Sequence, residues 1–348
     1  MNFNWRQTPA VAQTVDYRKN SLNTLKLIAA LQVLYGHAWV HMSYSFPTIV
    51  SNILGIFMGV PIFFMLSGFL VWTSVGSSSD YKNYASKRFW RIYPELWLGV
   101  LFELVVLLIL FKDKVNYLLL SVFAVTQGTV LQFWTPEFLR GYGCGTPNGA
   151  LWTICVTVQF YVIVWLLYKL LHKKKAIWWV LFFIVAVFIK ALSPAVEYYY
   201  PGIIYKLFKV SILPYLWLFI LGCALSEFRE KSIPFLKKYW FILLVLSFVV
   251  DIIKFDIDSA NYGILLYSLR VPGFIGMAYA LPRINVKRDI SYGIYIYHMT
   301  VINAMIELNL TGRLVYVILA LVLSVLLAYG STSFANFINE KINLRKVQ

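Results

Sequence analysis

Apolar runs of about 17 to 25 residues recur along this sequence from residue 22 to residue 337, separated by short polar or basic stretches. A helix of about 20 residues is long enough to cross the hydrocarbon core of a bilayer, and it satisfies its backbone hydrogen bonds internally. Hydrophobic residues make up 60% of the chain and charged residues 13%, and the mean hydropathy is +0.70. The sequence therefore predicts an all-α, polytopic helical bundle that is integral to a membrane.

The apolar runs predict ten transmembrane helices, near residues 22–41, 52–74, 91–111, 150–171, 176–192, 208–226, 238–254, 262–281, 289–308 and 313–337. The first run is long and lacks a small-residue cleavage site, so we expect it to remain as a span rather than to be removed as a signal peptide. We expect residues 1–348 to form a single membrane domain with a core of 21–337, without a soluble extracytoplasmic domain.

The positions of lysine and arginine predict the orientation, because basic loops stay on the cytoplasmic side. With the ten spans above, both termini are cytoplasmic, and one face carries the basic clusters Arg18/Lys19, Lys82/Lys87/Arg88, Lys173–Lys175, Arg229/Lys231/Lys237/Lys238, Arg283/Lys287/Arg288 and Lys341/Arg345/Lys346. Membrane topology and anionic lipid headgroups account for the net charge of +16, so the charge does not indicate nucleic-acid binding.

The segment 116–133 is apolar enough to be an eleventh span, but counting it would place the basic run at 172–175 outside the cell. We expect a re-entrant or interfacial segment within a long external loop, since partly inserted pieces are tolerated where protein or a water-filled cavity covers them.

Lys26 and His37 are ionisable residues within the first predicted span. They are 37 − 26 = 11 residues apart, which is about three full turns plus 20° of an α-helix and a rise of about 16 Å, so they share one face. An imidazole titrates near neutrality and can take a proton from an attacking hydroxyl. Each residue also has a structural explanation when it is taken alone. Lys26 can be a lysine that snorkels to the interface, and His37 can be a histidine bonded to a neighbouring helix.

A second group of charges lies in SKRFWRIYPELW, residues 86–97. Arg88 and Arg91 are three residues apart, so they point the same way if the helix has already begun. Paired guanidinium groups suit phosphates, which they grip through two hydrogen bonds each. The alternative is positive-inside anchoring, with the nearby aromatic residues as an interfacial belt.

Together, five motifs occur in one order along the chain: the K-x10-H pair Lys26/His37, VPIFFMLSGFL (60–70), the R-x-x-R pair Arg88/Arg91, GALWTICVTVQFY (149–161) and ISYGIYIYHM (290–299). This combination resembles acyltransferase family 3, a family of integral membrane proteins that O-acylate bacterial surface polysaccharides and related glycans. The resemblance runs over almost the whole chain.

The resemblance implies that an acyl group, usually acetyl, passes from cytoplasmic acyl-CoA to a sugar hydroxyl across the bacterial inner membrane. It implies that His37 is the essential histidine, and that Lys26, Arg88 and Arg91 bind the donor, acetyl-CoA, through its phosphates. The expected acceptor is a surface glycan, such as O-antigen or exopolysaccharide, or a lipid-linked oligosaccharide. His37 either deprotonates the acceptor hydroxyl or is transiently acylated itself.

Two positions depart from the family pattern. Asn23 stands where many relatives have an aspartate, and Thr157 stands where many have a glutamate. Neither side chain can carry charge or act as a base, although Asn23 can still cap a helix. Trp152 and Gln159 still fit the motif around Thr157 and are expected to support the site.

Arg270 and His298 are further candidates for supporting the site. An arginine at membrane depth requires a partner or water, and Asp251 or Glu103 is expected to serve. His298 either contributes to the site or is a structural histidine.

Two other classes of function, a zinc protein and a transporter, share some features of this sequence. His37, His41 and His298 suggest a zinc site, but no carboxylate accompanies them in an H-E-x-x-H arrangement, so no metal is expected. A polytopic transporter or flippase of lipid-linked glycan would share the architecture and the basic face, but it would not explain why Lys26/His37 and Arg88/Arg91 occur together.

Overall fold

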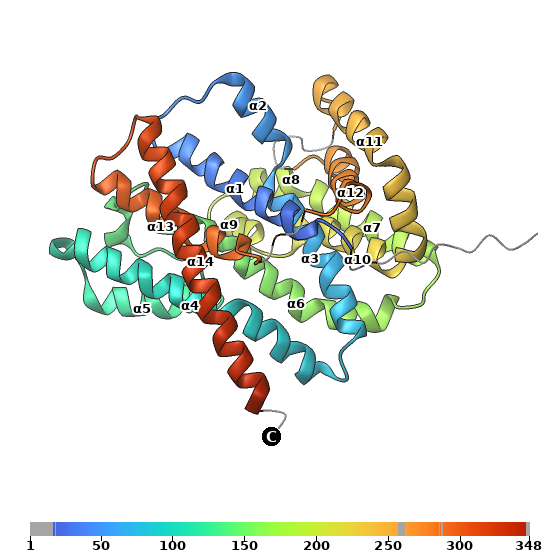
Figure 1. Cartoon of the computed structure of the whole chain (residues 1–348), viewed down its shortest axis with the longest axis horizontal. Helices are drawn as coiled ribbons and strands as arrows, with labels where there is room; N and C mark the ends of the chain where they lie inside the picture. The colour runs from blue at the N-terminus through green and yellow to red at the C-terminus, as the bar shows by residue number, and fades with distance from the viewer. Residues whose placement is uncertain (1–16, 18, 257–261, 285, 287, 346–348) are drawn as a thin grey trace, which may run out of the picture.

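The computed structural model describes residues 17, 19–256, 262–284, 286 and 288–345, with only the backbone for 339–345. Among these residues the regular structure is all helical, as predicted (Figure 1). The α-helices are α1 (Leu22–His41), α2 (Thr48–Ile56), α3 (Gly59–Gly76), α4 (Tyr81–Leu110), α5 (Tyr117–Gln127), α6 (Trp152–Leu171), α7 (Ala176–Ala191), α8 (Ser193–Tyr199), α9 (Ile203–Lys209), α10 (Leu216–Glu227), α11 (Arg229–Ile253), α12 (Ile264–Ala280), α13 (Ser291–Glu307) and α14 (Leu314–Arg345). Four short 3-10 helices join them, η1 (Lys112–Lys114), η2 (Glu137–Gly141), η3 (Gly149–Leu151) and η4 (Leu213–Tyr215).

Six helical stretches among the described residues are long and apolar enough to cross a membrane, namely Thr48–Gly76, Tyr81–Leu110, Gly149–Leu171, Ala176–Tyr199, Arg229–Ile253 and Leu314–Ile338. A seventh candidate is the pair Ile203–Lys209 and Leu213–Glu227, which is bent by 41°. The chain is therefore a multi-pass, all-helical membrane protein.

The three remaining predicted spans correspond to α1, α12 and α13. Each forms a helix, but α12 and α13 have only 17 residues, and none of the three meets the length and apolarity of a membrane span by itself. Almost every residue of α13 between Gly293 and Met305 is buried. Protein rather than lipid surrounds this helix, which explains why its sequence is less apolar.

Helix α4 begins ten residues before the start that the sequence predicted. Asp80 caps it, because the carboxylate accepts a hydrogen bond of 2.8 Å from the backbone N–H of Asn83. Hydropathy does not detect these first polar turns. As a consequence Arg88 and Arg91 both lie well inside the helix.

The segment 116–133 contains α5, which has 11 residues and rises about 16 Å, roughly half of the hydrocarbon thickness. It is too short to cross as a helix, in agreement with the prediction of an interfacial or re-entrant segment.

Two glycines bring α3 and α10 into close contact. A Cβ atom at Gly68 would lie 2.1 Å from the carbonyl oxygen of Phe219, and one at Gly222 would lie 2.0 Å from that of Met65. The glycine of the VPIFFMLSGFL motif thus fixes the position of α3, whose other residues line the site described below.

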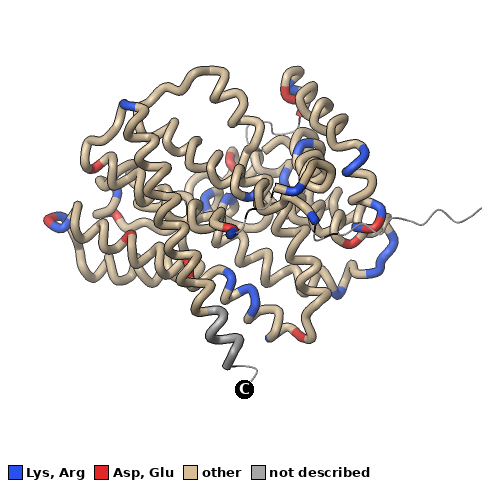
Figure 2. Tube along the Cα trace, viewed as in Figure 1, with Lys and Arg blue, Asp and Glu red and all other residues tan. Residues whose placement is uncertain are grey.

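Charged residues occupy short segments of a tube that is otherwise uncharged (Figure 2). Large apolar side chains are exposed on the outer helices α7 and α11, as expected for surfaces that face lipid.

The pair α11 and α12 lies at one side of the bundle and α5 at the opposite side (Figure 1). Arg18, Lys287 and Lys346 of the predicted basic clusters lie outside the described residues.

Candidate active site

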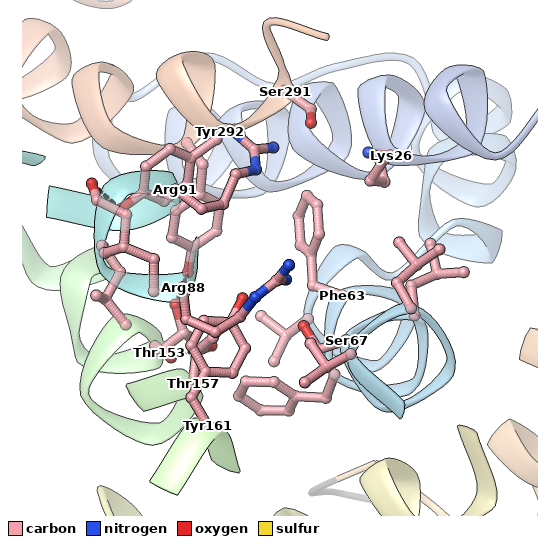
Figure 3. A pocket seen from close by; sticks show the side chains of 18 residues that line it. Lys26, Phe63, Ser67, Arg88, Arg91, Thr153, Thr157, Tyr161, Ser291 and Tyr292 are labelled. Atoms are coloured by element: carbon pink, nitrogen blue, oxygen red, sulfur yellow. Dashed lines mark hydrogen bonds between the residues drawn. The ribbon is translucent and has the colours of Figure 1, made fainter. Parts of the chain in front are cut away.

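A cavity of about 180 Å³ lies between α1, α3, α4, α6 and α13 (Figure 3). Its lining comprises Lys26 of α1, Val60, Phe63, Phe64, Leu66, Ser67, Leu70 and Val71 of α3, Arg88, Arg91 and Ile92 of α4, Thr153, Ile154, Thr157 and Tyr161 of α6, and Ser291, Tyr292 and Tyr295 of α13. Most of this lining is apolar, and its ionisable cations are Lys26 and the two arginines.

Arg88 and Arg91 both reach the cavity, as their spacing predicted (Figure 3). Arg88 donates a hydrogen bond of 2.9 Å to the hydroxyl of Ser74, and its guanidinium carbon lies 5.7 Å from the centre of the Tyr161 ring. The Nε of Arg88 is buried and has no hydrogen-bond partner among the described residues. The contacts of Arg88 thus leave one N–H of its guanidinium without an acceptor.

Lys26 and Arg91 share a carboxylate that the sequence analysis missed. Asp289, just before α13, forms an ion pair with Lys26, and its Oδ2 lies 3.4 Å from Nη2 of Arg91. Burial of Asp289 opposes ionisation, but the charges of Lys26 and Arg91 outweigh it and lower the pKa of this carboxyl below its usual value. One negative charge thus holds two of the three cavity cations.

The signal for Asp289 was present in the sequence. The residue directly precedes the ISYGIYIYHM motif, and it accepts hydrogen bonds from the backbone N–H and the hydroxyl of Ser291, as a residue does at a helix start. Sequence reasoning counted only the basic residues of this boundary. Asn23, which stands where the resemblance implies an acid, is exposed. The carboxylate beside Lys26 comes instead from a distant part of the chain.

Phe63 and Tyr295 form a part of the cavity lining that we call its inner wall. Their ring centres are 5.6 Å apart in an edge-to-face arrangement. The hydroxyl of Tyr295 accepts a hydrogen bond of 2.7 Å from Thr153 and donates one of 2.9 Å to the carbonyl of Ala150. Thr157, at the position of the family's glutamate, bonds to the backbone carbonyl of Thr153. The inner wall is therefore uncharged.

His37 does not line this cavity and lies beyond its inner wall. The ring centre of His298, which is completely buried on α13, lies 5.2 Å from that of His37. The ring of His41 stacks on that of His37, with their centres 5.9 Å apart. The ring of His298 in turn lies 5.7 Å from that of Tyr295. His298, a sequence candidate, is thus placed between the cavity wall and His37.

The sequence of this chain matches a known family over most of its length. The model of the acyltransferase domain family, acyltransferase family 3, matches residues 19–332. The chain belongs to this family. It is an O-acyltransferase of a multi-pass membrane type, which favours the enzyme over the transporter or flippase considered above.

Two relatives of this acyltransferase are similar over most of their length. "Nodulation protein 10" of Rhizobium leguminosarum bv. viciae is 30% identical over 320 residues, which cover 85% of this chain and 86% of the relative. An "O-acetyl transferase" of Shigella phage Sf6 is 24% identical over 294 residues, 81% of this chain and 84% of the relative. No solved structure matches.

Three residues predicted to support the site of this acyltransferase lie outside the cavity lining. The ring of Trp152 packs 5.3 Å from that of Tyr215. Gln159 donates to the carbonyl of Val210 at 2.9 Å and accepts from the N–H of Ile212 at 3.0 Å, so it ties α6 to the segment before η4. Both residues thus hold α6 in place rather than contact the cavity.

Arg270 is the third of these residues, and it joins α12 to α11. Its Nη2 lies 3.0 Å from Oδ2 of Asp251, one of the two partners that the sequence suggested. Glu103, the other suggested partner, is buried, and neither of its oxygens has a hydrogen-bond partner among the described residues. Arg270 therefore forms an ion pair between α12 and α11 and does not line the cavity.

The loop before α6 is fixed to the end of α13 in this acyltransferase. Asn303 accepts a hydrogen bond from the N–H of Cys144 and donates to the carbonyls of Thr146 and Pro147. Gly143, with a positive φ of 52°, donates from its N–H to Glu307 at 2.6 Å. A glycine is needed here because of the φ value and because a Cβ atom would lie 2.1 Å from Asn303.

Proposed function

We propose that this enzyme transfers an acyl group, with acetyl as the first candidate, from cytosolic acyl-CoA to a hydroxyl of a bacterial surface glycan such as O-antigen or exopolysaccharide. The observation that supports this most is Arg88, which lines the cavity without a carboxylate partner among the described residues, beside Lys26 and Arg91 in the same lining. CoA carries phosphates, which arginine binds through charge-assisted, paired hydrogen bonds.

The topology that we propose places all ten predicted helices in a bacterial inner membrane, with both termini in the cytoplasm. Lys26 and Asp289 lie near the starts of α1 and α13, and Arg88 lies in the N-terminal part of α4. The distribution of lysine and arginine assigns these helix ends to the cytosolic side. Anionic lipids are expected around the basic loops. In this orientation the donor enters the cavity directly from the cytosol.

The proposed chemistry is direct transfer at His37. The thioester end of acyl-CoA would reach His37 once the contacting rings of Phe63 and Tyr295 move apart, and the acceptor hydroxyl would approach His37 from the other side. His37 takes the hydroxyl proton as the oxygen attacks the thioester carbon, so that a C–O bond forms and the C–S bond breaks. The proton then passes to the thiolate of CoA, and His37 is restored.

The proposed acceptor is a sugar hydroxyl of a glycan or of a lipid-linked oligosaccharide. The similarity to the O-acetyl transferase of Shigella phage Sf6 supports acetyl transfer to oxygen. His37 lies about 16 Å along α1 from Lys26, which suits an acceptor that reaches the site from the side opposite the donor.

The test is expression of the wild type and of His37→Ala in a bacterial host that lacks acetylation of its surface glycans. Mass spectrometry of the glycan should reveal an added ester with the wild type and none with His37→Ala. The absence of any ester with the wild type would count against the proposed acceptor class, and undiminished acetylation by His37→Ala would remove His37 from the reaction.

A second measurement separates direct transfer from an acylated histidine. The purified protein is incubated with radiolabelled acetyl-CoA without an acceptor, then denatured and separated from free label. Direct transfer predicts no label on the protein, whereas an acyl-enzyme predicts label that His37→Ala loses.

A further inference from the structure

His298 has one ring nitrogen bonded and the other free. Its Nδ1 lies 3.1 Å from the carbonyl oxygen of Ile294, so Nδ1 carries the proton and donates it to the backbone. Its Nε2 is buried and has no hydrogen-bond partner among the described residues. A neutral imidazole that donates through Nδ1 has a lone pair on Nε2, so a free acceptor lies within the protein.

The ring neighbours of His298 leave one partner for this acceptor. Its two aromatic neighbours are Tyr295 and His37. The hydroxyl of Tyr295 already donates to the carbonyl of Ala150. His37 makes no hydrogen bond among the described residues, and its ring centre is 5.2 Å away, at an interplanar angle of 46°. The proposal therefore requires a rotation of the His37 ring that turns one of its nitrogens toward Nε2, which the separation of 5.2 Å between the ring centres allows.

We propose that His298 is a positioning residue that accepts the N–H of His37 at Nε2 and so fixes which nitrogen of His37 bears the lone pair. This inference rests on the proposed role of His37 as the base. A base needs its lone pair aimed at the acceptor hydroxyl, and in a neutral imidazole the partner of the N–H decides which nitrogen that is. When His37 takes a proton, the same N–H···N bond stabilises the imidazolium.

The alternative is a purely structural His298, held by its bond to Ile294. Two amide variants separate the two roles. In His298→Gln the amide reaches the position of Nε2 and its oxygen can accept from His37, whereas in His298→Asn the amide replaces Nδ1 and keeps only the bond to Ile294. A positioning role predicts that His298→Gln keeps the function of the wild type and that His298→Asn loses it. A structural role predicts the reverse.

The first readout is the tautomer of His37, which does not depend on acyl transfer. The chain has four histidines, so ¹⁵N-histidine labelling of the full-length protein in detergent gives few ring signals, and His37→Ala assigns those of His37. At pH 8 we expect a single neutral tautomer of His37 in the wild type and in His298→Gln, and a mixture in His298→Asn. An unchanged tautomer in His298→Asn would overturn the proposal.

The second readout is transfer from radiolabelled acetyl-CoA to the host glycan in membranes. We expect kcat to fall by about 100-fold in His298→Asn and by less than about 5-fold in His298→Gln, with the KM for acetyl-CoA within about 2-fold of wild type in both. The reverse order of activity would overturn the proposal. Because the tautomer is measured without substrates, a wild type that acetylates no glycan would contradict the proposed function but would leave the first readout decisive.

Discussion

Lys26 and Asp289, which are 263 positions apart in the sequence, form an ion pair at the rim of the cavity. Because Arg91 approaches the same carboxylate oxygen, this pair fixes the starts of α1 and α13 against α4. Arg88, by contrast, has no carboxylate partner in the described part of the chain. The three cations that the sequence grouped together thus divide into two that are held by Asp289 and one that is available to an anionic ligand.

Replacing Asp289 by asparagine should destabilise the fold. Asn keeps hydrogen bonding to Ser291 but leaves Lys26 and Arg91 without their shared charge. The side chains of Lys26 and Asp289 are 16% and 18% exposed, between the surface and buried cases, so we expect a loss of about 1–2 kcal/mol in the free energy of unfolding at pH 7. Denaturant titration in detergent micelles measures it, with Asp113→Asn at an exposed position as the control.

The stabilisation by Asp289 should depend on pH. The folded pKa of Asp289 lies below its unfolded value, so the stabilisation is present above an unfolded pKa of about 3.9 and is lost as pH falls through the folded pKa. The difference in unfolding free energy between wild type and Asp289→Asn should stay constant from pH 8 to pH 5 and shrink below about pH 4. A difference that grows with acidification would contradict the ion pair.

Arg88→Ala should weaken binding of acetyl-CoA more than it slows transfer. A hydrogen bond to a charged group contributes about 1.5–3 kcal/mol, so KM should rise by about 10- to 100-fold with little change in kcat. Lys87→Ala is the matched control, because this exposed neighbour carries the same charge but does not line the cavity. An equal rise of KM in both variants would mean that the effect comes from the general positive charge of this surface.

The sequence was sufficient to predict the helices and to select Lys26, Arg88 and Arg91, the cations that line the cavity. Backbone groups in lipid must be bonded internally, so long apolar runs have few alternatives to helix. The positions of Arg88 and Arg91 on one face follow from helical geometry alone. Arg88 and Arg91 can share a face only if α4 has already begun before Arg88. The cap at Asp80 meets this condition, because it starts the helix at Tyr81.

The sequence could not predict how distant segments meet. The pairing of Asp289 with Lys26 depends on α13 lying against α1, and the separation of His37 from the cavity depends on Phe63 and Tyr295 from two further helices. Lys26 and His37 share a helix face, as the sequence predicted, but Lys26 lines the cavity and His37 does not. Periodicity within one helix does not contain that information.

Arg270→Ala tests whether this residue is structural, as its distance from the cavity lining indicates. The side chain of Arg270 is 3% exposed, and it bonds to Asp251 and to the hydroxyl of Ser247. Its removal should lower the free energy of unfolding by about 2–4 kcal/mol, because buried bonds and packing are lost together. The KM for acetyl-CoA should stay within about 2-fold of wild type when measured below the unfolding temperature. A selective rise of KM would return Arg270 to the site.

Phe63→Ala should widen the range of acyl groups that the enzyme accepts. The ring of Phe63 meets that of Tyr295 in the inner wall of the cavity, so we expect it to limit the space for the acyl group of the proposed donor. Butyryl differs from acetyl by two methylene groups, each worth about 0.8 kcal/mol when buried, which together correspond to a preference of about 10-fold. The ratio of kcat/KM for butyryl-CoA to that for acetyl-CoA should therefore rise by about 10-fold in Phe63→Ala. Leu70→Ala is the control, since Leu70 lines the same cavity but is exposed, and it should leave the ratio unchanged. An equal change of the ratio in both variants would show that Phe63 is not the residue that limits acyl length.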